Sequence, residues 1–132
     1  MLKLGSLVVS FFLITFVHSQ QLIINEVSQG SGNGEYVELL VVGTLSCQTP
    51  AQCMDLRGFI IDDNNGYFAS GNGTGIASGA LRFANNPIWS CILPGTLIVV
   101  YNDADRNTAI PPDDISTNDG NCRLIIPASS TG

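Results

Sequence analysis

The chain has 132 residues, of which 45% are hydrophobic and 12% charged, and its formal net charge is −6. This length predicts a single domain. Beyond residue 19 only four arginines stand against eleven acids, which excludes nucleic acid as the main partner because binding to a phosphate backbone depends on Lys and Arg.

The first 19 residues have the pattern of a secretory signal peptide. Lys3 precedes thirteen mostly apolar residues, and Val17-His18-Ser19 is the kind of site that a signal peptidase accepts, so we expect cleavage between Ser19 and Gln20. A membrane anchor is the alternative, but thirteen helical residues span about 20 Å against a hydrocarbon core of about 30 Å. We expect a secreted or cell-surface protein without stable membrane insertion, whose mature domain covers residues 20–132.

The mature chain predicts an all-β fold. It has no stretch of ten or more residues with apolar positions at helical spacing, and short β-branched and aromatic runs alternate with turn residues. Asn65-Gly66 predicts a hairpin and Pro94-Gly95 a second turn. Strands are expected near 22–27, 35–42, 57–62, 67–69, 80–83, 88–93, 96–101 and 123–126. Short strands at this spacing favour a β-sandwich over a barrel.

Four cysteines in an exported chain predict two disulfides, and Cys47, Cys53, Cys91 and Cys122 allow three connectivities. We expect the pairs 47–53 and 91–122, because the first two cysteines bracket a short segment that can fold back on itself. A zinc site is the alternative, but the mature chain has no His and no C-x2-C pair.

Four motifs, taken in order, resemble the lamin tail domain family. They are the I-x-E strand in 22–27, the E-Y-V-E-L strand in 35–39, the D-L-x-G-F strand in 55–59 and the P-G-x-x-I strand in 94–98. The resemblance covers residues 22–101 and is closest to exported bacterial members, which occur as multidomain surface proteins or fused to nucleases. It implies an immunoglobulin-like β-sandwich.

The last third of the chain departs from the family's pattern. Only Arg123–Ile126 remains to close the sandwich, so we expect this strand to lack a neighbour and the fold to be incomplete at its C-terminus. The chain would then be the N-terminal part of a longer protein.

Three glutamates are candidates for catalytic carboxylates. Glu26, Glu35 and Glu38 suggest a pair like that of glycoside hydrolases, in which separations of about 5 to 9.5 Å decide the mechanism. The alternative is a structural role, in which they bind loop backbone or pair with Arg57 or Arg82. We favour the structural role.

Nucleophilic catalysis is not expected. Activating a Ser or Cys nucleophile requires a base, and the mature chain has neither His nor Lys.

A calcium loop is the one metal site that the sequence suggests. Asp103, Asp105, Asn107 and Asp114 offer alternating oxygen ligands, as hard cations require, but Thr108 stands where such a loop needs Gly. The alternative is a polar loop whose side chains cap turns. Apart from calcium, no cofactor is expected.

Two functions remain open. The first, which we favour, is a non-catalytic exported module for surface display, adhesion or binding of a protein, glycan or extracellular matrix partner. The second is an accessory domain of an extracellular hydrolase or nuclease whose catalytic part lies beyond residue 132. An aromatic group could form a sugar-stacking platform, although such residues more often fill a sandwich core; its members are Tyr67, Phe68, Phe83 and Trp89.

Overall fold

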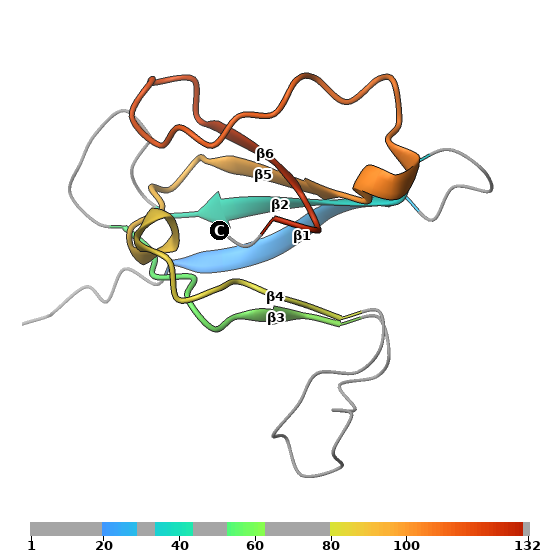
Figure 1. The fold of residues 1–132 in the computed structure, drawn as a ribbon. Coiled ribbons are helices and arrows are strands. Elements are labelled where there is room, and N and C mark those ends of the chain that lie inside the picture. The colour runs from blue at the N-terminus through green and yellow to red at the C-terminus, as the bar shows by residue number, and fades with distance from the viewer. Residues whose placement is uncertain (1–19, 29–33, 44–52, 63–79, 131–132) are drawn as a thin grey trace, which may run out of the picture.

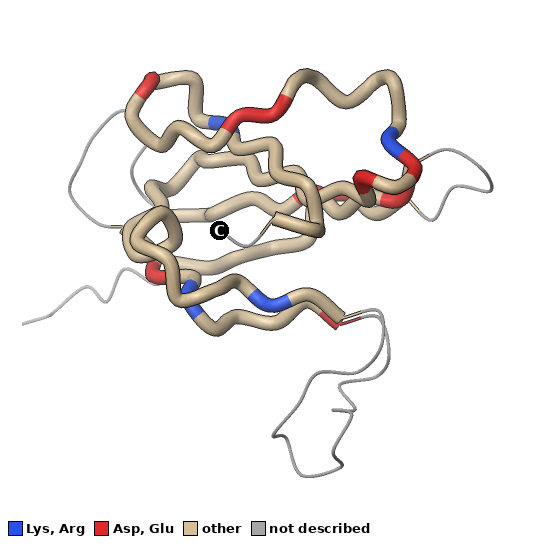
Figure 2. Tube along the Cα trace, viewed as in Figure 1, with Lys and Arg blue, Asp and Glu red and all other residues tan. Residues whose placement is uncertain are grey.

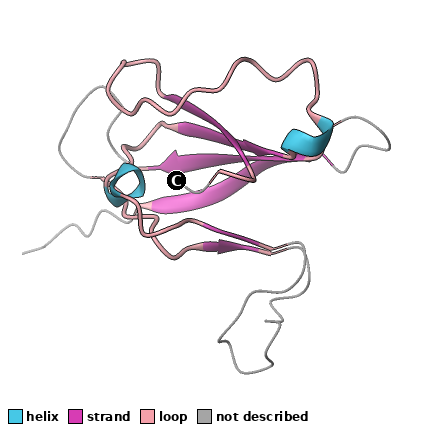
Figure 3. Cartoon of the chain, viewed as in Figure 1, coloured by secondary structure: helices cyan, strands magenta, loops and turns pink. Residues whose placement is uncertain are grey.

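The computed structural model describes residues 20–28, 34–43, 53–62 and 80–130, and it confirms an all-β fold (Figure 1). The strands of this part are β1 (Gln21–Ser28), β2 (Tyr36–Val42), β3 (Ile60–Ile61), β4 (Leu81–Arg82), β5 (Leu97–Tyr101) and β6 (Arg123–Pro127). Two short 3-10 helices, η1 (Pro87–Ser90) and η2 (Asp103–Asp105), lie at opposite ends of the main sheet (Figure 3). Neither of these helices could cross a membrane.

The main sheet has the strand order β1-β2-β5-β6. The β1–β2 and β2–β5 pairs are antiparallel, whereas β5 and β6 are parallel, with Ile98 opposite Leu124. The expectation that the last strand lacks a neighbour is therefore wrong. β6 pairs with β5 on one side, and on the other Ile125 exchanges two backbone hydrogen bonds, of 2.9 and 2.8 Å, with Asp114.

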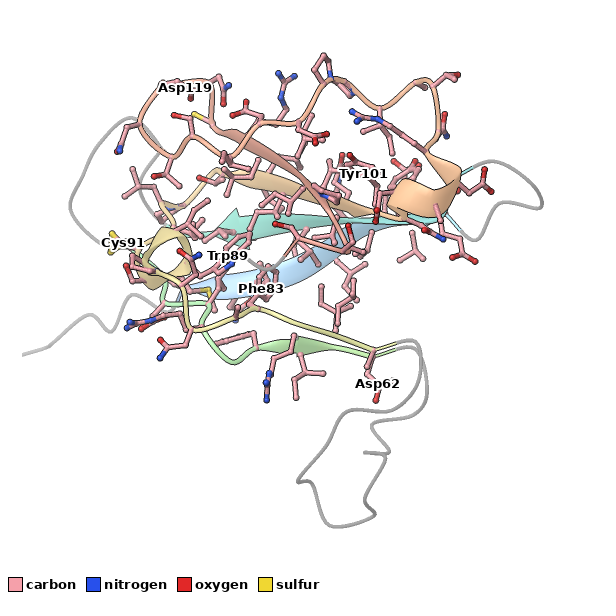
Figure 4. All side chains as sticks on the ribbon, viewed as in Figure 1. Asp62, Phe83, Trp89, Cys91, Tyr101 and Asp119 are labelled. Atoms are coloured by element: carbon pink, nitrogen blue, oxygen red, sulfur yellow. A yellow bond between two sulfur atoms is a disulfide. The ribbon has the colours of Figure 1, made fainter. Side chains whose placement is uncertain are left out.

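The core lies between one face of this sheet, here called the core face, and a second layer formed by residues 53–62 and 80–93. Leu56 and Trp89 of this layer are buried against Leu39 and other strand residues. Phe83 and Trp89 meet edge to face, with ring centroids 4.6 Å apart (Figure 4). These two aromatics therefore fill the core, and Tyr67 and Phe68 lie outside the described residues.

A disulfide ties the two ends of the second layer together. Cys53 and Cys91 are bonded, with their Cα atoms 4.8 Å apart, next to a β-bridge between Met54 and Ile92. Both predicted pairs are wrong, because 47–53 and 91–122 each contain one cysteine of this bond. Sequence proximity misled the prediction, since antiparallel pairing of the two segments brings distant cysteines together. Cys122 is also disulfide-bonded, and Cys47 lies outside the described residues.

The strand expected at 88–93 is the other clear error. Asn86 caps a helical turn there by accepting a hydrogen bond from the Ile88 backbone N–H at 3.1 Å, and Pro87 fixes the first helical position. Only Ile92 keeps a strand-like bridge. The strands expected at 57–62 and 80–83 shrink to β3 and β4, which form a two-stranded sheet of their own. The strand at 67–69 and the Asn65-Gly66 hairpin lie outside the described residues.

The Pro94-Gly95 turn is confirmed. Gly95 has a φ of +89°, which L-residues rarely adopt, and the Thr96 backbone N–H donates to the Leu93 carbonyl at 3.1 Å. The turn leads directly into β5 at Leu97 and so aligns this strand with β2.

The connection between β5 and β6, residues 102–122, covers the opposite face of these two strands. There Ile110 packs on a cluster that contains Tyr101 and Ile125. The Tyr101 hydroxyl donates to Asp113 at 2.7 Å, and the Arg106 guanidinium binds the same carboxylate at 2.8 Å and lies 4.5 Å from the centre of the Tyr101 ring. Burial and the Asp113 carboxylate raise the pKa of Tyr101, so the phenol stays protonated. We call these three side chains the Tyr101 clamp.

Candidate binding groove

A groove of about 750 Å³ opens on the core face of the sheet, near β1. It lies between the β1–β2 end of the main sheet and the β3–β4 ladder. Most of its lining is aliphatic: Ile24, Val27, Val37, Ile61, Leu81, Val100 and Ala128. We call it the β1 groove.

Within the described residues, the second layer stops short of the β1 edge of the sheet, and the groove opens there. Ile24 pairs with Leu39 and Val27 with Val37, so both β1 side chains share the core face with buried β2 residues. Nevertheless Ile24 is 60% exposed and Val27 55% exposed. The apolar surface of the core thus continues outward along β1 into solvent.

A β-bulge at Asn25 explains how residues 24 and 27 share one face. In a regular strand, side chains three positions apart point to opposite faces. The register of β1 on β2 shifts between Ile24 and Glu26. Asn25 is therefore an extra residue that has no opposite position in the ladder with β2. Its side chain amide donates to Glu38 Oε1 at 2.5 Å on the opposite face.

The charged side chains among the described lining residues are both acidic. Glu35 lies at one end of the groove, where its Oε2 accepts a hydrogen bond of 3.3 Å from the Asn102 side chain, and Asp62 follows β3. Several acidic residues lie around η2, at the same end of the sheet (Figure 2), and they include Asp103 and Asp105 of this helix. The groove is therefore apolar along its length and negative at its rim.

The candidate catalytic glutamates have structural partners. Glu26 and Glu38 are directly opposite each other on the face away from the groove. Glu26 accepts a hydrogen bond of 2.6 Å from the Tyr36 hydroxyl, which raises the pKa of that phenol. The expected pairing with Arg57 is wrong, because this guanidinium binds Asp55 and lowers the pKa of that carboxyl to about 2. Among the described ion pairs none involves Arg82.

The four proposed calcium ligands do not converge. Asp103 accepts hydrogen bonds from the backbone and hydroxyl of Ser129, which lower its pKa, and Asn107 caps the backbone N–H of Ala109. Asp114 binds Ser116 and Asn121 instead. In the described part of the chain, which includes Asp105, no three or more His, Cys, Asp or Glu side chains are grouped so that they could hold a metal. Asn107 and Asp114 therefore hold turns of the 102–122 connection, whereas Asp103 joins η2 to the segment after β6.

Asn107 also makes a packing contact that the sequence alone does not indicate. It packs against Gly34, which has a φ of +83°. A Cβ at position 34 would lie only 2.2 Å from Asn107 Cβ, so no side chain fits there. This contact brings the 102–122 connection against the start of β2, beside Glu35. It thus sets one end of the β1 groove.

Sequence reasoning missed the groove. Leu22, Ile23 and Ile24 form an apolar run like those of β5 and β6, and nothing in the run tells which side chains remain uncovered. The one available signal was Asn25, a poor strand residue in the middle of a strand pattern. An interruption of that kind is typical of a bulge.

Comparisons with protein-family models, with curated proteins and with solved structures found no match to this chain. The function of the β1 groove must therefore be inferred from its own chemistry.

Proposed function

We propose that this protein is an exported, non-catalytic binding module that holds a partner in the β1 groove. The observation that carries the proposal is the exposure of Ile24 and Val27 beside a groove lined with aliphatic side chains. Exposed, contiguous apolar surface that borders a concave site is typical of a binding site. The structural partners of Glu26, Glu35 and Glu38 support a role other than catalysis.

The proposed setting is the cell exterior or surface, and the proposed fold is an immunoglobulin-like sandwich of the lamin tail type. The Cys53–Cys91 disulfide supports an oxidising compartment, as does the signal-like leader. A four-stranded sheet packed on a second layer supports a sandwich, and the four lamin-tail-like motifs fall on β1, β2, the segment before β3 and β5.

Site-directed photocrosslinking in the producing cells tests the proposal. A photoreactive residue at position 27 should form an adduct with an extracellular partner, and excess unlabelled protein should suppress the adduct. Position 115 is the matched control, because Ile115 is 65% exposed and lies outside the groove. Equal adducts at both positions, or none at position 27, would refute a binding role for the groove.

A further inference from the structure

Among the described residues, the outer edge of β1 has no pairing strand, and it lies next to the groove. β1 is the first strand of the order β1-β2-β5-β6, and in the described part of the chain its backbone pairs only with β2. Alternate N–H and C=O groups of an edge strand point away from the sheet, where a further strand can bind them. The edge therefore presents a row of hydrogen-bonding groups directly beside exposed Ile24 and Val27.

This combination of edge and groove suits an extended polypeptide. When a peptide adds to a sheet edge, its main chain supplies affinity, and every second side chain enters the same surface. On β1 that surface is the aliphatic groove, so the inward side chains of the peptide should be aliphatic. A compact small molecule would leave the unpaired backbone of β1 unused.

The acidic rim of the groove favours a partner whose side chains outside the groove are basic. Glu35 and Asp62 are acidic, and no basic side chain is among the described residues that line the groove. Beyond the leader, the whole chain carries four basic and eleven acidic residues. A segment that carries Lys or Arg is complementary to this surface and is attracted over a distance.

A second copy of this chain fits less well than such a segment. Antiparallel pairing of two β1 edges would bring together two acidic surfaces, each with Glu26 within the pairing strand. The bulge at Asn25 also bends the edge and interrupts straight self-pairing. A flexible peptide can follow the bend, whereas a rigid second sheet cannot.

We propose that the β1 groove binds an extended segment of a partner protein, with alternating aliphatic and basic side chains, that adds to β1 as a new edge strand. This inference rests on the proposed binding function and names the chemistry of its partner. The aliphatic side chains pack on Ile24 and Val27, and the basic side chains lie near Glu35.

The experiment uses fluorescent peptides and the full protein as it is exported. A short peptide of alternating lysine and valine should bind saturably, as measured by fluorescence anisotropy. A matched peptide of alternating glutamate and valine should bind at least about tenfold more weakly, because its charges oppose the rim. N-methylation of alternate amides in the lysine peptide should weaken binding by a similar factor, because it removes the donors needed for strand addition.

Variants of the protein locate the binding site. Val27→Ser should weaken binding of the lysine peptide, whereas Ile115→Ser, a change of the same kind outside the groove, should leave it unchanged. Glu35→Gln should weaken binding more than Asp119→Asn, although both variants have the same net charge. Asp119 lies far from the Asp62 end of the molecule (Figure 4).

Four outcomes would overturn the inference. One is equal binding of the lysine and glutamate peptides, and another is full binding of the N-methylated peptide. The third is a dimer in sedimentation analysis that Val27→Ser dissociates, which would identify a second copy as the occupant. A partner crosslinked at position 27 together with a failure of all peptides would refute the strand-addition mechanism and leave the proposed binding function standing.

Discussion

The two edges of the main sheet have similar apolar sequences but differ in burial. At one edge β5 and β6 form a parallel pair, and Ile98, Leu124 and Ile125 have no exposed surface. At the other edge β1 is also an apolar run, yet Ile24 and Val27 are more than half exposed. Parallel strands are typically covered on both faces, and here the second layer and the 102–122 connection supply the cover.

The difference shows that neighbours, and not the apolar run itself, decide whether a strand is core or surface. A covered edge should contribute to folding stability and an uncovered edge to binding. Substitutions at the two edges should therefore separate these properties, and the following predictions test that separation.

Removal of the Cys53–Cys91 disulfide should have the largest effect on stability. The bond closes a loop with a sequence separation of 38, and its loss should lower the free energy of unfolding by about 4 kcal/mol on the chain-entropy model. Urea unfolding of the variant Cys53→Ser/Cys91→Ser measures the effect. A loss below about 1 kcal/mol would show that the second layer holds its position without the bond.

Ile125→Ala tests the covered edge directly. Ile125 has 0% exposure, so truncation leaves a cavity and should cost about 3 kcal/mol of unfolding free energy. Ile115→Ala, at an exposed site in the neighbouring connection, should change it by less than about 0.5 kcal/mol. Equal losses in the two variants would contradict the contrast between buried and exposed sites.

Tyr101→Phe tests the clamp that holds the 102–122 connection on β5. The variant keeps the buried ring but loses the hydroxyl that joins Asp113 and Arg106. We expect the unfolding free energy to fall by about 1 kcal/mol, the usual effect of a lost hydrogen bond. Hydrogen exchange should show faster exchange of the Ile125 amide, which bonds to Asp114 of the same connection. Unchanged exchange would mean that the clamp does not secure this cover.

The clamp should also weaken in acid. The Tyr101 hydroxyl, followed by the Arg106 guanidinium, lowers the pKa of Asp113 below its ordinary value of 3.8. A carboxyl with a lowered folded pKa stabilises the protein above its unfolded pKa, and this contribution disappears as the pH falls through the folded value. The stability difference between the wild type and Asp113→Asn should thus be constant above about pH 5 and narrow as the pH falls below 3.8 and through the folded pKa of Asp113. A difference that is constant with pH would exclude this carboxylate as the titrating group.

Ile24→Ser should have the smallest effect on stability, although Ile24 lies in β1, the longest strand described. Because Ile24 is 60% exposed, the unfolding free energy should change by no more than about 0.5 kcal/mol. Binding of the lysine and valine peptide should nevertheless fall. A large loss of stability would mean that the β1 edge is part of the core after all.

The strands of the main sheet could be predicted from the sequence, because their apolar runs are bounded by turn residues such as Pro94-Gly95. The η1 turn could not, since Ile88 and Trp89 also suit a strand and only the Asn86-Pro87 pair indicates a helical start. Disulfide pairing depends on the antiparallel contact of Met54 with Ile92, which is distant in sequence. The groove depends on where the second layer ends, and local residue patterns carry no information on that.

The bulge at Asn25 has a consequence for the solubility of the protein. Without Asn25 the pairs Ile24–Leu39 and Glu26–Glu38 would follow each other in an unbroken ladder. Its deletion would therefore give β1 a longer and straighter edge, and an edge of that shape can pair with further strands and aggregate. The one extra residue of the bulge is therefore expected to protect the β1 edge from aggregation at high protein concentration.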